Sequence, residues 1–208
     1  MAQEQLPDQN FYNDNAETYC QATVKVDMGD ARERFLRMLQ PGARILDAGC
    51  GSGRDMRAFM LRGFLVSGFD ASPQMASYAS SYSGRTCEIL RFQDMQFHNE
   101  FDGVWSCAAL LHVPKHDMED VMNRLVNSLK SNGVAYFSFI EGEGERVSSD
   151  GRLYNSYTSD SLRALLRKIG RVREVEFWTS VDSGAQSRPA PWLNMIVQKL
   201  SSKESNCI

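Results

Sequence analysis

Three glycines at every second position carry the strongest chemical signal in this sequence. Gly49, Gly51 and Gly53 follow a short apolar run that ends in Asp47, and a helix-like sequence begins directly after them. Glycine lets the backbone turn without a Cβ clash, and it lets a ligand lie directly on the main chain. The pattern therefore predicts a strand, a ligand-binding loop and a helix, although an ordinary glycine-rich turn between a strand and a helix shares it.

A second apolar run ends in an acid shortly after the glycines. The residues from Leu65 to Phe69 lead to Asp70. An acid at the tip of the second strand of a βαβ unit is placed to accept hydrogen bonds from a ribose. Together the two signals predict a nucleoside-bearing cofactor in a crevice at the carboxyl ends of parallel strands.

The spacing of the glycines discriminates between cofactors. The nicotinamide fingerprint Gly-x-Gly-x-x-Gly would need its third glycine where this chain has Arg54, and no Gly-Lys-Ser/Thr follows, as a P-loop requires. The carboxylate of Asp47 beside the loop would repel a pyrophosphate and would suit a ligand with a cationic end. S-adenosylmethionine meets these conditions, because it carries an adenosine, a sulfonium and an ammonium but no phosphate.

The run Leu46-Asp47-Ala48-Gly49-Cys50-Gly51-Ser52-Gly53 resembles motif I of the class I S-adenosylmethionine-dependent methyltransferases. The resemblance extends from about Phe11 to Leu200 and implies an enzyme of the EC 2.1.1 class that releases S-adenosylhomocysteine. The run Phe-x-x-Gly-Glu-Gly-Glu from Phe139, followed later by Trp-Leu-Asn, looks like a small bacterial subgroup related to tellurite-resistance proteins. That finer resemblance assigns no methyl acceptor.

The predicted cofactor site combines residues from the strand ends with family positions. Asp47 orients the glycine loop and accepts charge from the methionine end, and Asp70 binds the ribose hydroxyls. By the resemblance, Asp94 faces the adenine amino group, whereas Arg54 either reaches the cofactor carboxylate or is solvated. The cofactor-binding residues expected are Tyr12, Tyr19, Asp47, Gly49, Cys50, Gly51, Ser52, Gly53, Arg54, Asp70, Ala71, Gln93, Asp94, Met95, Ser106 and Cys107.

The N-terminal segment from Phe11 to Tyr19 resembles the Tyr-x-x-x-Ala-x-x-Tyr lid of small-molecule methyltransferases. In that reading Tyr12 and Tyr19 close over the methionine moiety and expel water. The alternative is an amphipathic helix whose two tyrosines pack on the body of the protein. We assign residues 11–40 to this lid and the helix after it.

Catalysis of methyl transfer needs alignment and, for some acceptors, a base. His112 follows the fourth predicted strand at the catalytic end of the sheet and is the candidate general base, since histidine titrates near neutral pH. The substrate wall is expected from the last strands and the loop after the fifth. Its predicted members are Glu143, Glu145, Tyr157, Trp178, Arg188 and Trp192.

The rest of the chain alternates strands and helices and predicts a doubly wound, mostly parallel α/β sheet of seven strands with an antiparallel C-terminal hairpin. The expected helices are Asp30–Leu39, Arg54–Leu61, Pro73–Tyr82, Lys115 to Asn132-Gly133, and Ser159–Ile169. The expected strands are Arg44–Asp47, Leu65–Asp70, Cys87–Phe92, Phe101–Ser106, Val134–Ile140, Val172–Thr179 and Trp192–Leu200.

Composition restricts the partners. The 208 residues suit a single domain, and residues 201–208 read as a frayed tail. A formal net charge of −3 argues against a basic nucleic-acid face. Five cysteines without Cys-x-x-Cys spacing predict neither disulfides nor a metal site, and the absence of a signal-like or membrane-spanning segment predicts a cytoplasmic protein.

Three functions stay open from the residues. The leading one is a methyltransferase that acts on a small molecule, as a monomer or homodimer. The missing Asp/Asn-Pro-Pro-Tyr/Phe tetrapeptide after the fourth strand argues against methylation of nucleic-acid base amino groups. The alternatives are a methyltransferase that modifies tRNA or nucleotides, and a module that binds the cofactor without catalysis.

Overall fold

Parallel strands joined by crossover connections form the centre of the molecule. The computed structural model describes residues 7–181 and 191–201. Its parallel strands are β1 (Arg44–Ala48), β2 (Leu65–Asp70), β3 (Cys87–Ile89), β4 (Phe101–Ser106) and β5 (Leu129–Glu141). They lie in the order β3-β2-β1-β4-β5, so the chain starts in the middle of the sheet and reverses direction beside β1. Ligands of such sheets bind at this switch point.

Two antiparallel strands extend the sheet beyond β5. β9 (Pro191–Lys199) lies beside β5, and β8 (Val172–Val181) pairs with β9. The predicted α/β class, the mostly parallel sheet and the antiparallel C-terminal pair are thereby confirmed.

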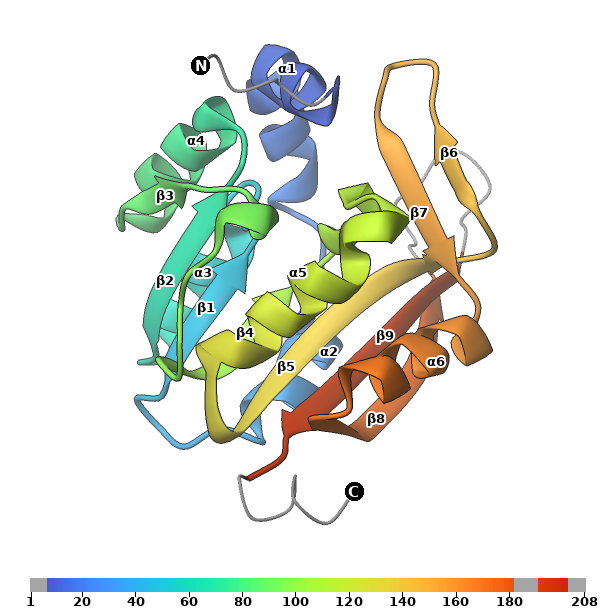
Figure 1. Ribbon diagram of the computed structural model, residues 1–208. Helices are drawn as coiled ribbons and strands as arrows, with labels where there is room; N and C mark the ends of the chain where they lie inside the picture. Colours follow the sequence, from blue (N-terminus) through green and yellow to red (C-terminus); the bar gives the residue numbers. More distant parts are fainter. Residues whose placement is uncertain (1–6, 182–190, 202–208) are drawn as a thin grey trace.

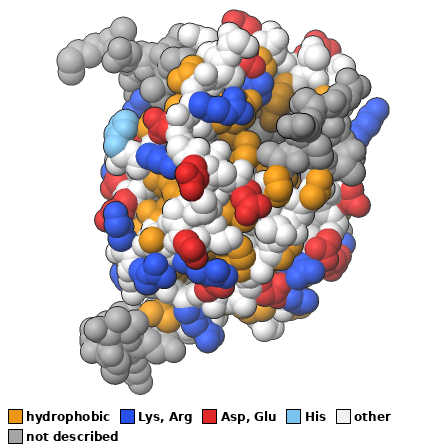
Figure 2. Space-filling view, turned by 90° about the vertical axis from the view of Figure 1, so that its right-hand side faces the viewer, with side chains coloured by type: hydrophobic (Ala, Val, Ile, Leu, Met, Phe, Trp, Pro, Cys, Tyr) orange, Lys and Arg blue, Asp and Glu red, His pale blue; other side chains and the backbone are white. Residues whose placement is uncertain are grey.

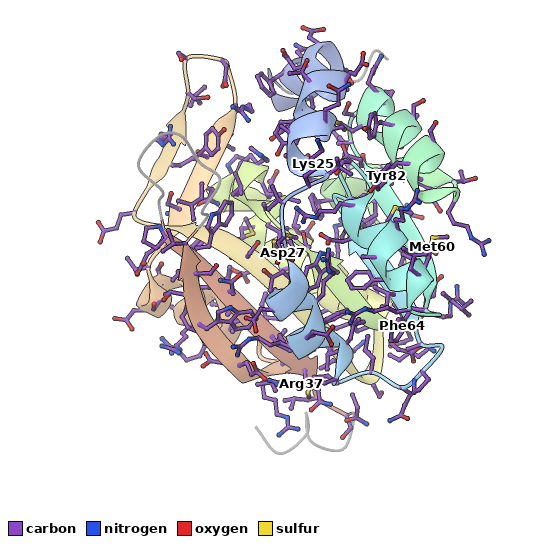
Figure 3. All side chains as sticks on the ribbon, turned by 180° about the vertical axis from the view of Figure 1, so that it is seen from behind. Lys25, Asp27, Arg37, Met60, Phe64 and Tyr82 are labelled. Carbon is purple, nitrogen blue, oxygen red and sulfur yellow. The ribbon has the colours of Figure 1, made fainter. Side chains whose placement is uncertain are left out.

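Helices cover both faces of the sheet, because its parallel strands are apolar on both sides. α5 (Lys115–Ser128) and α6 (Ser159–Ile169) cover the face that is in front in Figure 1. α2 (Gly29–Leu36) and α3 (Arg54–Leu61) cover the opposite face, seen in Figure 3. There Phe35 of α2 and Phe59 of α3 pack with Trp105 of β4, with ring centroids 5.4–5.9 Å apart.

One further helix crosses the carboxyl-end edge of the sheet. α1 (Pro7–Thr23) packs on α4 (Pro73–Ser83), and Ala16 and Cys20 of α1 are buried against Met75 of α4. The N-terminal segment is therefore helical through both of its tyrosines. Figure 1 shows this helix above the strand ends, on the opposite side from a hairpin of two short strands.

The predicted end of α5 at Asn132-Gly133 is wrong. The helix ends at Ser128, and β5 begins at Leu129. Asn132 has a φ of 63°, and the pairing of β4 with β5 slips between Phe101 and Gly103. An Asn-Gly pair supplies a left-handed residue equally well to a helix end and to a strand irregularity, and here it serves the strand.

The count of seven strands is also wrong, because the predicted loop after β5 forms a hairpin. β6 (Glu145–Val147) and β7 (Leu153–Tyr157) are antiparallel, and β7 continues the sheet at Ile140–Glu141, past the last β5 residue that pairs with β4. The described residues thus form a nine-stranded sheet. A single-turn helix η1 (Phe92–Asp94) replaces the end of the predicted third strand, and another, η2 (Leu110–His112), precedes α5.

The ends of the chain are only partly covered by the structure. Residues 202–208 of the predicted frayed tail lie outside the described residues. Within 7–181 and 191–201, no helix has both the length and the apolar character needed to cross a membrane.

Close approach of two helices generates a first prediction. Gly53 precedes α3 with a φ of +73°, and a Cβ there would lie 3.0 Å from the backbone of Ala79 in α4. Gly63 has a φ of +83° with nothing within 4 Å of its would-be Cβ. We expect Gly63→Ala to lower the free energy of unfolding by about 1–2 kcal/mol through backbone strain alone. Gly53→Ala should cost clearly more, because the clash adds to the strain.

Urea unfolding of the two alanine variants beside the wild type measures this difference. Equal losses for Gly53→Ala and Gly63→Ala would show that α4 does not constrain the glycine loop.

Candidate active site

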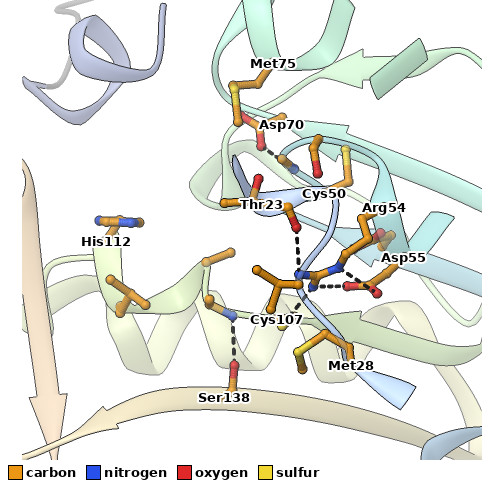
Figure 4. Close-up of a pocket in the computed structure, with 18 of the residues that line it drawn as sticks. Thr23, Met28, Cys50, Arg54, Asp55, Asp70, Met75, Cys107, His112 and Ser138 are labelled. Atoms are coloured by element: carbon orange, nitrogen blue, oxygen red, sulfur yellow. Dashed lines mark hydrogen bonds and ion pairs between the residues drawn. The ribbon is translucent and has the colours of Figure 1, made fainter. Parts of the chain in front are cut away.

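The carboxyl ends of β1, β2 and β4 open into a cavity of about 870 Å³, near the upper end of the ~300–1,000 Å³ typical of ligand pockets. Its walls come from α1, the glycine loop, η2, the start of α2, and strands β5, β7, β8 and β9. Figure 4 shows residues from these elements turned toward one space. The cavity therefore lies at the predicted position in the sheet.

The glycine loop is fixed to the neighbouring strand by its own backbone. The N–H groups of Gly49 and Cys50 both donate to the carbonyl of Phe69, at 3.0 and 2.9 Å. Gly49 has a φ of 74°, and a Cβ on it would lie 2.5 Å from the Cβ of Ala109. Only glycine fits between β1 and the segment after β4, so main chain faces the cavity here.

Asp70 receives the next N–H of the loop. Its Oδ2 accepts from Gly51 N at 3.0 Å, and its Oδ1 accepts from Ser72 N at 2.9 Å. Burial raises the pKa of Asp70, while the N–H groups of Ser72, Gly51 and Ala71 oppose that rise. Each carboxylate oxygen keeps acceptor capacity for a hydroxyl, so the geometry suits a pair of ribose hydroxyls.

Asp47 presents an unsatisfied oxygen at the same cavity. Its side chain is 2% exposed, and Oδ2 has no hydrogen-bond partner among the described residues. Burial, and then repulsion from Asp55, raises the pKa of Asp47 well above the usual value. A buried acceptor without a partner is costly, and an ammonium group on a ligand would satisfy it.

Arg54 and Asp55 form the base of the cavity. The guanidinium donates to Asp55 at 2.6 Å, to the Thr23 carbonyl at 3.4 Å and to Cys107 Sγ at 3.6 Å (Figure 4). Asp55 also accepts from Arg32 at 2.8 Å and from the Trp105 indole at 3.0 Å.

Asp55, at the N-terminus of α3, is a buried acceptor for two arginines and a tryptophan. Burial opposes its ionisation, yet the guanidinium groups of Arg54 and Arg32 hold the pKa of Asp55 below the usual value. A charged Asp55 thereby fixes Arg54 in the cavity wall.

His112 is held at both ring nitrogens. Nδ1 lies 2.7 Å from the Leu153 carbonyl of β7, and Nε2 lies 2.7 Å from the Tyr12 hydroxyl of α1. A carbonyl can only accept, so Nδ1 carries the proton and Nε2 accepts from Tyr12. Burial lowers the pKa of His112 to about 4, against the effect of the Leu153 carbonyl. His112 is thus neutral at pH 7 and joins α1, η2 and the β7 hairpin.

The far half of the cavity is bounded by one face of β5, β8 and β9. Trp178, Trp192 and Ser138 line it, and Ser138 Oγ accepts from Ala108 N at 2.8 Å. Asn194 accepts from the Tyr136 hydroxyl at 2.7 Å and donates to Ser180 Oγ at 2.9 Å. The buried polar groups of this wall are paired with one another, and none of the contacts named here is a charge pair.

The cavity gathers most of the residues predicted from the sequence. Those that line it are Tyr12, Tyr19, Asp47, Gly49, Cys50, Gly51, Ser52, Arg54, Asp70, Ala71, Gln93, Cys107, His112, Trp178 and Trp192.

Seven other predicted residues do not line it. Gly53 packs on α4, Asp94 is ion-paired to Arg91 at 2.7 Å, Met95 is buried, and Ser106 donates to the Ala48 carbonyl at 2.9 Å. Glu143 is exposed, Glu145 accepts from Lys115 N at 2.7 Å, and the Tyr157 ring packs on Phe139. Arg188 lies outside the described residues.

Sequence reasoning missed several lining residues. Arg152 precedes β7 in the unpredicted hairpin, and Ser138 comes from the predicted strand β5. The alternation of side chains along β5 was the available signal for Ser138, since it shares a face with Tyr136.

Comparison with known proteins agrees with this geometry. Residues 45–133 match the model of a family described as a methyltransferase domain. The 24-methylenesterol C-methyltransferase 2 of Oryza sativa subsp. japonica is 33% identical over 118 residues, which are 51% of this chain and 32% of the plant protein. Its Arabidopsis thaliana counterpart is 31% identical over 113 residues, 50% of this chain and 30% of that protein. The chain thus spans about a third of the length of these relatives.

Solved structures share the fold over nearly the whole chain. One is the Burkholderia thailandensis 1,6-didemethyltoxoflavin-N1-methyltransferase with bound 1,6-didemethyltoxoflavin and S-adenosylhomocysteine. It has a TM-score of 0.75 and 21% identity and covers 97% of this chain and 93% of its own. Magnesium protoporphyrin IX methyltransferase from Synechocystis PCC 6803, with bound S-adenosylmethionine, has a TM-score of 0.69 and 17% identity over 95% of this chain and 100% of its own.

The finer resemblance to tellurite-resistance proteins stays a prediction, since none of these matches concerns it. The match to a methyltransferase-domain family over residues 45–133 agrees with the broader resemblance, and the solved structures share the fold.

Proposed function

We propose that this protein is a cytoplasmic methyltransferase that moves a methyl group from S-adenosylmethionine to a small molecule. The observation that carries the proposal is the Asp70 carboxylate, held at 3.0 Å by the glycine loop and open to a ribose. Buried free thiols at Cys20, Cys50 and Cys87 support a reducing compartment.

The residues of the cavity fit this cofactor in type and charge. Asp70 would hold the ribose hydroxyls, and the unpartnered oxygen of Asp47 would take the ammonium group. The Arg54 guanidinium in the same wall is the natural partner for the methionine carboxylate. Leu90, Phe92 and Gln93, which follow β3, would supply apolar surface and one amide oxygen for the adenine, since the Gln93 amide nitrogen donates to Asp117. The bare glycine loop lies between these groups.

The bound cofactor supplies the reactive methyl group on its cationic sulfur, so the chain has no electrophile to create. The task of the protein is to orient the acceptor and exclude water, and positioning of this kind can contribute roughly 7–11 kcal/mol of the barrier. α1 serves the second purpose. Tyr12 and Tyr19, whose ring centroids are 5.1 Å apart, both line the cavity, and Tyr12 ties α1 to His112. We propose that they form the lid over the methionine end.

The acceptor is best placed against the wall formed by Ser138, Trp178 and Trp192. Tryptophan rings offer apolar and stacking surface, and the buried Asn194 beside them is already satisfied by Tyr136 and Ser180. Such a wall favours a compact acceptor with an apolar or ring-shaped body. Figure 2 shows acidic and basic side chains interspersed on one face, without a continuous basic stripe that would favour nucleic acid.

His112 is retained as the candidate base, with a restricted role. Its neutral ring lines the cavity, but a pKa of about 4 makes it a weak base, and its Nε2 is engaged by Tyr12. We propose that it assists acceptors whose proton is easily lost, and that acceptors without such a proton react without it.

The proposed function is tested directly by titration calorimetry and a methyl-transfer screen. We expect the protein to bind S-adenosylmethionine and S-adenosylhomocysteine, and not NAD⁺. With labelled methyl donor, label should enter a bacterial small-metabolite fraction and leave bulk tRNA unlabelled. Label in tRNA would favour the nucleotide-modifying alternative, binding without transfer would indicate a cofactor-binding module, and failure to bind either sulfur compound would refute the assignment.

Asp70→Asn tests the ribose contact. The change keeps the shape but removes the charge, and hydrogen bonds to charged groups contribute about 1.5–3 kcal/mol, so affinity for S-adenosylhomocysteine should fall by roughly 10–100-fold. Asp120→Asn on the exposed face of α5 is the matched control, since Asp120 pairs with Arg124 away from the cavity. Equal affinities of the Asp70 variant and the wild type would contradict the assignment.

Folding should depend on pH through His112. Its pKa of about 4 in the folded protein lies below the ordinary 6.5, so between these values the unfolded chain binds the extra proton. Above pH 6.5 His112 is neutral in both states and does not affect stability. As the pH falls from 6.5 to 4, the free energy of unfolding decreases because the unfolded chain binds a proton that the folded protein does not. The variant His112→Asn keeps a donor toward Leu153 but cannot titrate in this range. We expect its free energy of unfolding to fall by about 2–3 kcal/mol less than that of the wild type between pH 6.5 and pH 4.

Chemical denaturation of wild type and variant at pH 7, 5.5 and 4 measures this term. The exposed-histidine variant His98→Asn is the control, and its profile should follow the wild type. Parallel profiles for His112→Asn and the wild type would show that His112 is not held neutral in the folded state.

A further inference from the structure

Two thiols meet directly behind the glycine loop. Cys50 Sγ and Cys87 Sγ are 3.1 Å apart, and both side chains are buried. Cys50 lies between two loop glycines, and Cys87 is the first residue of β3, paired with Gly68 of β2. A disulfide bond is about 2.05 Å long, so a shift of about 1 Å would bring these sulfur atoms to bonding distance.

We propose that Cys50 and Cys87 form an oxidisable dithiol, whose disulfide ties the glycine loop to β3 and weakens cofactor binding. The effect on the cofactor rests on the proposed function, whereas the bond itself does not.

The pair has no part in the chemistry proposed for the cavity. It lies in a small apolar cluster with Met56, Ala76 and Ala79, whereas Cys20 contacts Met75 and Cys107 contacts Arg54. The loop is bound on its other side to β2, through the N–H groups of Gly49 and Cys50 and the Phe69 carbonyl. The Cys50 side chain thus connects the loop to β3.

The oxidant reaches the pair through the cavity, which Cys50 lines. With hydrogen peroxide, the Cys50 thiolate attacks one oxygen, the O–O bond breaks, and a sulfenic acid and hydroxide form. The hydroxide takes up the proton that the Cys50 thiol lost and becomes water. The Cys87 sulfur then displaces hydroxide from the sulfenic sulfur, and the S–S bond and a second water form. Two thiols lose two electrons and two protons, and the peroxide takes up both. A dithiol reductant reverses the bond by exchange.

The rate of oxidation should rise with pH. The hydrogen bond between the two thiols, and then burial, raises the pKa of Cys50 well above its usual value. The thiolate that attacks the peroxide is therefore scarce at pH 7 and grows with each added pH unit.

The disulfide acts on the cofactor site through Gly51, the residue that follows Cys50. The N–H of Gly51 donates to Asp70 Oδ2 at 3.0 Å. Movement of Cys50 toward β3 displaces this N–H from the carboxylate, so ribose binding and disulfide formation oppose each other. Linkage requires the reciprocal effect: bound cofactor disfavours the disulfide by the same factor. A cofactor in the cavity also blocks the route of the oxidant.

The bond is tested by treating the wild type with hydrogen peroxide, blocking free thiols and mapping peptides by mass spectrometry. We expect a Cys50–Cys87 linkage in the monomer that dithiothreitol removes. In Cys87→Ala, Cys50 should appear only as sulfenic or sulfinic acid. Linkage of other cysteines, or persistence of both thiols at pH 9, would overturn the proposal. Because the wild-type map needs no variant, poor folding of Cys87→Ala leaves this result intact.

The effect on binding is tested by titrating S-adenosylhomocysteine into reduced, oxidised and re-reduced protein. We expect affinity to fall by about tenfold on oxidation, as one weakened hydrogen bond to a charged group would cause, and to recover on reduction. Oxidised Cys87→Ser is the matched control and should lose less affinity. Unchanged affinity in the linked protein would overturn the regulatory effect. If the disulfide forms but reduced protein binds no S-adenosylhomocysteine, the proposed function fails and the dithiol stands.

Discussion

The contact between the Asp70 carboxylate and the N–H of Gly51 decides how the cofactor half of this protein is built. It joins the ends of the neighbouring strands β1 and β2, beside the point where the sheet reverses direction. A carboxylate in this position needs donors, and the loop can supply them only if its main chain is bare. The glycines, the Phe69 carbonyl that anchors them and the close approach of Ala109 all follow from that requirement.

Charged side chains lie at the base of the cavity, whereas the far wall named above is formed by uncharged polar and aromatic side chains. At the base, the single carboxylate of Asp55 pairs with both Arg54 and Arg32, which leaves one positive charge in excess. One buried oxygen of Asp47 has no partner among the described residues. The far wall, by contrast, relies on paired hydroxyl and amide groups and on tryptophan. A cationic donor at one end and a compact, ring-bearing acceptor at the other match this gradient.

The sequence was sufficient for the parts of the fold whose signals are local. The run from Leu46 to Gly53 and the acid at Asp70 identified two strands and a loop, because glycine spacing and strand-end acids act over a few residues. The Asn132-Gly133 pair was misread because a left-handed residue has the same local signature in a helix end and in a bulge.

The features that sequence reasoning did not predict depend on which partner a segment or side chain contacts. The β6–β7 hairpin joins the sheet at the end of β5, beyond the last residue that pairs with β4. Asp94 forms an ion pair with Arg91 and does not line the cavity, and the local sequence does not specify which of these two positions its side chain takes. Tyr12 and His112 are 100 residues apart in sequence, and their hydrogen bond could not be read from either segment.

The two portions of the cavity come from different parts of the chain, and the second begins with the long strand β5. The loop, Asp70 and the proposed adenine contacts come from residues before position 94, whereas Ser138, Trp178 and Trp192 come from β5 onward. The segment shared with the family ends at residue 133, just as the second portion begins. Such a chain can exchange one recognition surface while the other is inherited intact. Substitutions in β5, β8 and β9 could thus change the acceptor specificity without altering the residues proposed to bind the methyl donor.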